Sequence, residues 1–461
     1  MSSQTSAAPP TTRLTTPPTL GPEHSVAWPK RVTRTLHNGL EVVLAESHAF
    51  PKIAAELFVR SGNAVTALTA PGLAEMTAAV IRTGTARRTS RQIEEALRGM
   101  GADLGTSAGA DTSAISIRGL SEFSNGLIEL LSELAREPVF PAEEFERIRR
   151  QKVEELRIER TTPGFLASER LRRTLFGAHP YAIIAPKESQ VDAYLREDLN
   201  SYYRDYYTPS NALLVVVGDF AAPKMLDIIE KHFGGWTGSM AKKLCGAEPP
   251  EHHGRRAHLV HLPGTVQTEI LIGNRAITRL HPDWLRLTLA NSIYGGAFNS
   301  RLVRNIREEK GYTYSPRSSA SALREYGYFT IHAAVRNDVV AATLTETFYE
   351  LDRIRSVSVG EQELDDARNY MSGVFSLGIA TQDGMMNQLS TVYLHGLPPD
   401  YLETYRERIR SLTSEDVLMA ARRHFDSANA QIVIVGDREQ IACQAGLFAD
   451  VKQYDPQGNE I

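Results

Sequence analysis

The sequence is short of cysteine, of long apolar runs and of excess positive charge. Cys245 and Cys443 are the only cysteines in 461 residues, which excludes a disulfide-stapled scaffold and any zinc site built from several cysteines. Lysine and arginine together number 51 against 55 for aspartate and glutamate, so the net charge of −4 argues against a generally basic nucleic-acid binder. Because of this charge balance we expect no nucleic-acid partner. No run of 18 apolar residues occurs, and we therefore expect no membrane span.

Residues 1–30 also lack the apolar core of a signal peptide. Six prolines stand among serines and threonines here. Such a segment buries too little surface to order itself, so we expect an extended arm. As it stands the chain carries no export signal, which is typical of a cytoplasmic protein. A mature form whose leader has been removed would instead belong to the periplasm.

The chain as a whole has the composition of a folded protein, with 42% hydrophobic and 23% charged residues, and the part after residue 30 contains an internal duplication. The stretch 198–220 (DLNSYYRDYYTPSNALLVVVGDF) and the stretch 416–438 (DVLMAARRHFDSANAQIVIVGDR) share a helical pattern, an Asn-Ala turn and a buried strand that ends in Val-Gly-Asp. The turn stands the same number of residues before the glycine in both. This repeat predicts two copies of one domain rather than a solenoid of short repeats.

The duplication and the local composition together set the expected domain boundaries. Glycine and proline are concentrated between the two periodic regions, which is typical of a linker. We expect an arm at 1–30, a first domain at 31–235, a linker at 236–256, a second domain at 257–440 and a C-terminal tail at 441–461.

The apolar pattern within each copy predicts an α+β fold, with an antiparallel-rich sheet covered by helices. Asn38-Gly39 is a turn signal near the start of the first copy, and a capping pattern at Ser90 opens a helix that Gly101 stops. The expected strands lie at 53–62 and 112–120, and at 257–262, 267–275, 313–322 and 327–335. The expected helices lie at 90–101, 121–136, 142–160 and 165–176, and at 282–294, with further helices up to residue 425.

The stretch 71–85 (PGLAEMTAAVIRTGT) resembles the insulinase/pitrilysin metallopeptidases, in particular their processing-peptidase branch. We expect a helix from Gly72 in this stretch, and in active members this helix carries the inverted zinc motif H-x-x-E-H between a Gly-Leu-Ala lead and a Gly-Thr exit. The resemblance continues through many segments in matching order over residues 31–440. It implies two homologous domains that form half of a clam-shell.

The zinc motif itself is missing from this chain. Glu75 stands at the first histidine position, Ala78 at the position of the catalytic glutamate and Ala79 at the second histidine position. Glu155 stands where the family has its third zinc ligand. Zinc catalysis needs three protein ligands, a polarised water and a base, and alanine supplies none of these. We therefore expect no metal in this chain.

No other cluster in the sequence replaces the lost motif. His252 and His253 lie in the expected linker, and His258 and His261 fall on opposite faces of the strand after it, so these four do not converge as metal ligands. The sequence carries neither the G-x-S-x-G signature of a serine hydrolase nor a phosphate-binding P-loop.

The second copy carries a different functional pattern, in the stretch 295–315 (GGAFNSRLVRNIREEKGYTYS). In two-subunit members of the family, one subunit holds zinc and its partner supplies an arginine and a tyrosine seven residues later. Arg307 and Tyr314 have this spacing, with Arg307 expected to close a helix and Tyr314 to begin a strand. Gly295 and Gly296 fit either close approach of a substrate backbone or a plain helix-ending turn.

Tyr312 is the alternative phenol, because it lies two residues from Tyr314 and would share its face of a strand. A guanidinium can hydrogen-bond a substrate carbonyl, and a phenol can donate to the oxyanion of a tetrahedral intermediate. The resemblance thus implies a non-zinc subunit of a heterodimeric zinc endopeptidase. Its partner would be a homologous H-x-x-E-H subunit that holds the zinc, and its substrates unstructured peptides.

Two other functions fit the same fold. One is an inert structural subunit, like the core proteins of the respiratory cytochrome complex. The other is a peptide-binding clamp that acts without a catalytic partner. The Arg307 and Tyr314 pattern favours the catalytic subunit over both.

Overall fold

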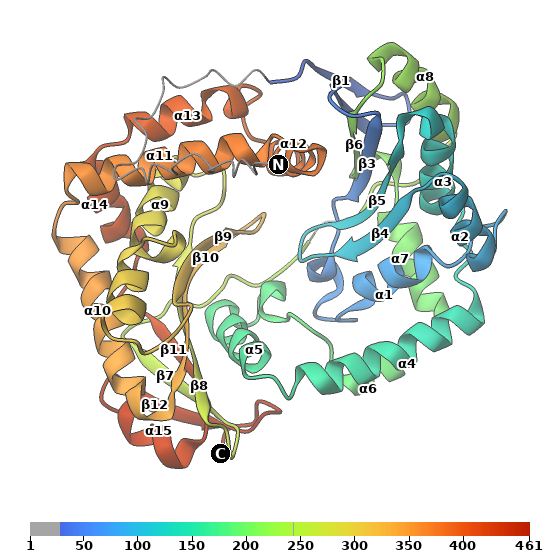
Figure 1. The fold of residues 1–461 in the computed structure, drawn as a ribbon. Helices are drawn as coiled ribbons and strands as arrows, with labels where there is room; N and C mark the ends of the chain where they lie inside the picture. Colours follow the sequence, from blue (N-terminus) through green and yellow to red (C-terminus); the bar gives the residue numbers. More distant parts are fainter. Residues whose placement is uncertain (1–27, 243) are drawn as a thin grey trace, which may run out of the picture.

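The computed structural model describes residues 28–242 and 244–461, which fold into two domains (Figure 1). Most of the expected arm at 1–30 lies outside the described residues. Of its last three residues, Trp28 packs against Phe375 of the second domain, with ring centroids 5.7 Å apart. None of the described helices combines the length and the apolar character that a bilayer crossing requires.

Each domain is built on a six-stranded sheet. The first contains β1 (Arg31–Thr35), β2 (Glu41–Glu46), β3 (Lys52–Val59), β4 (Asp103–Ala108), β5 (Ser113–Leu120) and β6 (Ala212–Gly218), in the order β1-β2-β6-β3-β5-β4. The second contains β7 (Arg256–His261), β8 (Gln267–Ala276), β9 (Arg317–Ala322), β10 (Gly327–Arg336), β11 (Gln431–Gly436) and β12 (Asp450–Tyr454), in the order β12-β7-β11-β8-β10-β9.

Five strands of each sheet follow the same order, β2-β6-β3-β5-β4 in the first and β7-β11-β8-β10-β9 in the second. The sixth strand differs. β1 precedes the shared strands and runs antiparallel to β2, whereas β12 follows them and runs parallel to β7. Most neighbouring strands in both sheets are antiparallel, so the expected α+β fold with two homologous, helix-covered sheets is confirmed.

Helices of the first half of the chain are α1 (Leu73–Ile81), α2 (Ser90–Gly99), α3 (Ser124–Arg136), α4 (Ala142–Glu159), α5 (Pro163–Phe176), α6 (Glu188–Asp192), α7 (Arg196–Tyr206) and α8 (Ala222–Phe233). Those of the second half are α9 (Trp284–Asn291), α10 (Val340–Ser356), α11 (Glu361–Gly378), α12 (Gln382–His395), α13 (Tyr401–Ser411), α14 (Ser414–His424) and α15 (Arg438–Ala445). Two π-helical turns, Ser292–Gly296 and Val303–Glu309, lie between α9 and β9.

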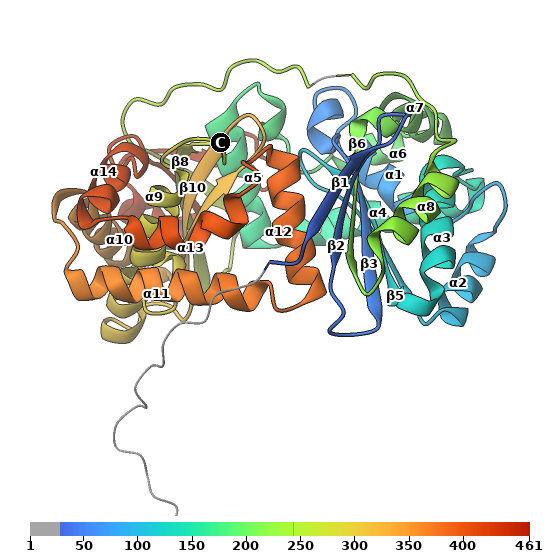
Figure 2. The same ribbon diagram turned by 90° about the horizontal axis from the view of Figure 1, so that it is seen from above.

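Two helices are exchanged between the domains (Figures 1 and 2). Helix α5 belongs to the first half of the chain but packs on β8 and β11 of the second sheet, and α12 of the second half packs on β3 and β6 of the first. Every residue of β6 and of β11 is buried, which requires cover on both faces of these strands. The exchanged helices supply the second cover and hold the two domains together.

The tips of two hairpins also join the domains. The backbone N–H of Arg324, after β9, donates to Asp111 Oδ2 over 2.8 Å, and its guanidinium donates to the carbonyls of Arg60 and Asp111. The hydroxyl of Tyr181 donates to the other oxygen of Asp111 over 2.5 Å. Asp111 is therefore bound from both sides, and the hairpin tips are fixed against each other.

Some elements begin or end elsewhere than the sequence pattern indicates. The strand expected at 313–322 begins at Arg317, so Tyr314 lies in the loop before it. Residues 441–461, expected as a tail, include the end of α15 and strand β12. In the described chain, the segment between α8 and β7 has neither helix nor strand.

Candidate functional site

The structure brings Arg307 and Tyr314 into direct contact. The guanidinium carbon of Arg307 lies 4.6 Å from the ring centroid of Tyr314 and 4.9 Å from that of Phe298. Both rings are exposed, Tyr314 by 80% and Phe298 by 71%. Cation–π attraction at these distances holds the guanidinium beside the two rings, so the three side chains form one surface group.

The route that brings the two residues together differs from the expected one. Arg307 lies inside the π-helical turn Val303–Glu309 rather than at the end of an α-helix. Gly311 then reverses the chain with a φ of +64°, a value that favours glycine. Tyr314 stands in the loop that follows, where its side chain is not constrained to a strand face.

Tyr312 occupies a different environment from Tyr314. It is half-buried and packs against the core of the second domain, and its N–H donates to the carbonyl of Ile306 over 3.0 Å. Tyr312 and Tyr314 do not share one strand face as expected, because neither residue lies on the strand. Tyr314 is the phenol beside Arg307.

Gly295 and Gly296 are explained by internal packing. A Cβ on Gly295 would come within 2.6 Å of Ser318 Oγ and 2.7 Å of a Leu302 methyl carbon. A Cβ on Gly296 would come within 2.5 Å of the side-chain nitrogen of Asn291 and 3.0 Å of its carbonyl oxygen. Both glycines therefore allow the turn after α9 to pack closely, and their geometry gives no separate indication of substrate approach.

The four positions of the degenerate zinc motif do come together. Glu75, Ala78 and Ala79 on α1 line one hollow of about 610 Å³ with Glu155 on α4. The edge strand β4 forms another wall of this hollow. The four positions of the degenerate motif therefore share one hollow in this chain.

Lys152, which the sequence analysis did not identify, links the two carboxylates. Its ammonium nitrogen lies 2.7 Å from Glu75 Oε1 and 3.8 Å from Glu155 Oε2, and its side chain is only 13% exposed. Burial lowers the pKa of Lys152, but the hydrogen bond and charge of Glu75, with the charges of Glu159 and Glu155, raise the pKa by more. The group therefore stays cationic, and its spacing of three residues from Glu155 on one helix was the available sequence signal.

These side chains do not fit a zinc ion. The two alanines offer no lone pair, and the carboxylate of Glu75 already accepts a hydrogen bond from Lys152. A divalent cation in the same hollow would lie beside a buried ammonium, which repels it. The pocket at the degenerate motif therefore contains the ammonium of Lys152, and its residues do not support metal chemistry.

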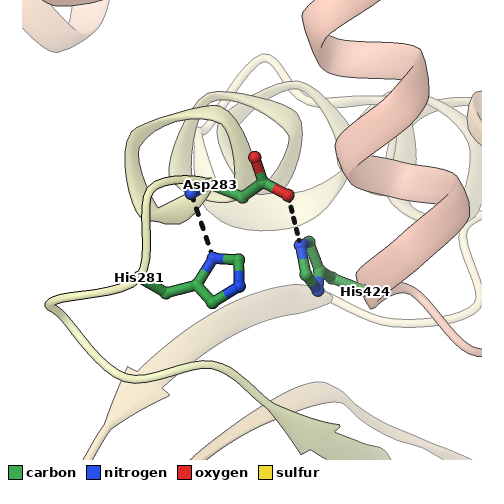
Figure 3. A group of neighbouring side chains, drawn as sticks. All are labelled: His281, Asp283 and His424. Carbon is green, nitrogen blue, oxygen red and sulfur yellow. Dashed lines mark hydrogen bonds and ion pairs between the residues drawn. The ribbon is translucent and has the colours of Figure 1, made fainter.

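One group in the described part of the chain has the spacing of a metal site, namely His281, Asp283 and His424, whose ligand atoms lie within 4.8 Å of one another (Figure 3). None of the four histidines around the linker belongs to it. Of those four, His258 is buried on β7, where its ring stacks on Tyr454, and burial lowers its pKa to about 4.

Hydrogen bonds already occupy the atoms that a metal would need. Asp283 accepts from His424 Nε2 over 3.2 Å and from the guanidinium groups of Arg423 and Arg286 over 3.1 and 3.0 Å. The N–H of Asp283 donates to His281 Nδ1 over 3.1 Å. With two arginines on the carboxylate, the group is an ion-pair cluster that joins the start of α9 to the end of α14.

Comparison with known proteins relates both halves of the chain to one family. Residues 41–184 match the model described as Insulinase (Peptidase family M16), and residues 194–371 match the model described as Peptidase M16 inactive domain. Among curated relatives, the uncharacterized zinc protease YmxG of Bacillus subtilis is 23% identical over 357 residues, which are 77% of this chain and 86% of the relative. The non-peptidase homolog YmxG of Helicobacter pylori is 23% identical over 409 residues, which are 87% of this chain and 92% of the relative.

Solved structures have the same fold. A peptidase M16 inactive domain from Pseudomonas fluorescens superposes with a TM-score of 0.83 at 26% identity, covering 88% of this chain and 98% of that one. A protease from Helicobacter pylori superposes with a TM-score of 0.83 at 20% identity, covering 88% of this chain and 99% of that one.

Proposed function

The chain belongs to the M16 (insulinase) peptidase family, and from this premise we propose that it is the non-zinc subunit of a heterodimeric zinc endopeptidase. Its contribution would be substrate binding and transition-state stabilisation through Arg307 and Tyr314. Zinc would be held by a homologous partner subunit that carries an intact H-x-x-E-H motif. The substrates would be unstructured peptides.

The contact between Arg307 and Tyr314 is the observation that carries this proposal. Their side chains touch, and the tyrosine ring is exposed at the protein surface. Nε of Arg307 lies 3.2 Å from Glu308, and its two terminal nitrogens have no partner in the described chain. They are free to hydrogen-bond a peptide carbonyl, while the phenol of Tyr314 can donate to an oxyanion that develops nearby.

The edge strands of the two sheets provide a way to hold an extended peptide. β4 and β9 each pair with a single neighbour in their sheet, so each has one free edge. A peptide that adds as another strand gains main-chain hydrogen bonds without a fixed sequence. β9 begins three residues after Tyr314, so a peptide along its edge would pass close to the Arg307 and Tyr314 side chains.

A second candidate function is a non-catalytic one, as a structural subunit or a peptide clamp. The pairing of Lys152 with Glu75 in the degenerate motif is compatible with this function, as it is with the catalytic subunit, because neither needs a metal in this chain. The name of the Helicobacter pylori relative, non-peptidase homolog, agrees with this alternative.

Co-purification followed by an activity assay distinguishes the two functions. The chain is produced with a homologue from its own genome that carries H-x-x-E-H, and hydrolysis of unstructured fluorogenic peptides is measured for each subunit alone and for the pair. The proposal expects activity from the pair only, and loss of that activity with a zinc chelator. A stable pair that is no more active than the zinc-bearing subunit alone would support the structural role instead.

A further inference from the structure

A second hollow, of about 520 Å³, lies between α5 and the face of the second sheet, next to the edge strand β9. Three cross-strand pairs of β9 and β10 form its floor: Arg317 with His332, Ser319 with Thr330, and Ser321 with Tyr328. Alternate residues of a strand share a face, so all six side chains are directed to this side of the sheet. The exchanged helix α5 forms the wall of the hollow that faces these side chains.

Arg317 is the available positive charge in this hollow. Its side chain is exposed at the start of β9, and no hydrogen bond or ion pair joins it to another described residue. Arg172, the other arginine of the hollow, is already engaged. Its guanidinium carbon lies 4.6 Å from the ring centroid of Tyr328, and its Nε donates to the carbonyl of Tyr181 over 3.0 Å.

The remaining polar groups set the charge that the hollow can accept. Glu269 pairs with Nε2 of His332, which leaves Nδ1 of that ring buried and without a partner. The hydroxyls of Ser319 and Thr330 bond to each other over 2.9 Å beside these groups. A guanidinium with nearby hydroxyl donors suits an anion, while the carboxylate of Glu269 opposes a multiply charged one. A single carboxylate is the ligand that this balance favours.

The position along the chain connects the hollow to the edge of the sheet. Arg317 follows Tyr314 by three residues, a span of roughly 11 Å at most. A peptide added to the free edge of β9 would turn alternate side chains toward the face on which Arg317 lies. The hollow is therefore within reach of the same peptide that would contact Tyr314.

We propose that this hollow is a carboxylate-binding subsite for extended peptides, with Arg317 as its specificity-determining residue. As part of a peptidase substrate site the proposal rests on the proposed function, but the binding itself requires only this chain. The carboxylate can belong to an acidic side chain or to the C-terminus of the peptide. Both present the same group to the guanidinium.

The test measures binding of three labelled peptides to the isolated full chain by fluorescence anisotropy. All three are eight-residue Ala/Ser/Gly peptides with an N-terminal fluorophore. One has a free C-terminal carboxylate and no acidic residue, one has an amidated C-terminus and a central glutamate, and one has an amidated C-terminus and no acid. We expect at least one carboxylate peptide to bind about tenfold or more tightly than the uncharged one, as for a charge-assisted hydrogen bond. Which of them does so identifies the source of the carboxylate.

Variants of the chain then assign that preference to the hollow. Arg317→Gln should abolish it, and Arg317→Lys should restore part of it. Arg256→Gln, at an exposed arginine at the start of β7 in the same sheet, is the matched control and should leave it intact. Glu269→Gln removes the opposing negative charge and should strengthen binding of the carboxylate peptide, which loss of structure would not do.

Equal binding of all three peptides, or equal effects of Arg317→Gln and Arg256→Gln, would overturn the proposal. Thermal unfolding of each variant separates loss of binding from loss of fold. Because no partner subunit is present, failure of the heterodimer to form or to hydrolyse peptides would not alter this result. Conversely, failure of the isolated chain to prefer carboxylate peptides would not bear on the roles of Arg307 and Tyr314, which are tested separately in the assembled pair.

Discussion

The ammonium of Lys152 lies 2.7 Å from a carboxylate oxygen of Glu75, the first residue of the degenerate motif. The pair joins α4 to α1 across the degenerate motif. The ammonium of Lys152 thus offsets the negative charge of the acidic groups in this pocket.

Replacing Lys152 by glutamine should destabilise the chain. The pair is buried on the lysine side and half-exposed on the glutamate side, so its loss should cost about 1–3 kcal/mol, between the values for exposed and buried pairs. Urea unfolding measures the difference. Lys310→Gln is the control, because Lys310 pairs with Glu346 over 3.6 Å at the surface. Loss of this exposed ion pair should lower the free energy of unfolding by at most about 1 kcal/mol. Equal effects of the two substitutions would contradict the role of Lys152.

The wild-type chain should bind no stoichiometric zinc, and restoring the ligands should not suffice. We expect the triple variant Glu75→His, Ala78→Glu, Ala79→His to bind zinc poorly while Lys152 remains, because the ammonium charge of Lys152 would lie beside the zinc ion. Adding Lys152→Gln should tighten binding by about tenfold or more. Competition with a chromophoric chelator gives both affinities, and elemental analysis covers the wild type. One tightly held zinc per wild-type chain would refute this expectation.

Substitutions of Arg307 and Tyr314 test the proposed catalytic role in the assembled pair. Tyr314→Phe keeps the ring and its contact with Arg307, so it removes only the hydroxyl and should lower kcat by about 100-fold to 1000-fold if that hydroxyl stabilises an oxyanion. Arg307→Ala should also raise KM, because a grip on the ground-state carbonyl contributes uniform binding.

Tyr312→Phe serves as the matched control for Tyr314→Phe. Tyr312 packs against the core, and loss of its hydroxyl should leave kcat unchanged. Size-exclusion chromatography confirms that each variant still assembles. If Tyr314→Phe retains the full kcat in an intact pair, Tyr314 has no catalytic role and the structural function becomes the better interpretation.

The buried His258 should make the second domain sensitive to acid. Burial lowers its pKa to about 4, aided by the charge of Arg170, although a hydrogen bond to Gln431 raises it in part. In the unfolded chain the imidazole of His258 has its ordinary pKa of ~6.5, so it binds a proton more readily than in the folded chain. The stability contribution is fully present above pH ~6.5 and is lost as the pH falls toward 4, by up to about 3 kcal/mol.

Unfolding measured between pH 4 and pH 7 checks this dependence. His258→Gln should flatten the acid side of the stability profile, because the titrating group is gone. His253→Gln, at a histidine in the segment before β7, should leave the profile unchanged. Parallel profiles for the wild type and His258→Gln would show that other groups govern the acid response.

Features that depend on local pattern and residue chemistry could be predicted from the sequence. The repeated strands that end at Gly218 and Gly436 indicated two related domains. This was possible because apolar patterns and turn residues depend only on neighbouring positions in the chain. Ala78 and Ala79 could be recognised without any knowledge of the fold as residues that cannot ligate zinc, because a methyl group has no lone pair. Arg307 and Tyr314 were identified through the resemblance to the two-subunit family members, whose arginine and tyrosine have the same seven-residue spacing.

Which surfaces meet could not be predicted in this way and follows from the packing of the folded chain. A helix at 165–176 was predicted from the sequence, but the packing of α5 on the second sheet was not, because a helical pattern does not specify the sheet that covers the helix. Lys152 and Glu75 are 77 positions apart, and their ion pair exists because α1 and α4 cross there. Likewise, Arg317 and Glu269 share a hollow because the order of β8, β10 and β9 places them on one face. Contacts between distant segments depend on the packing of whole elements, and sequence periodicity describes each element alone.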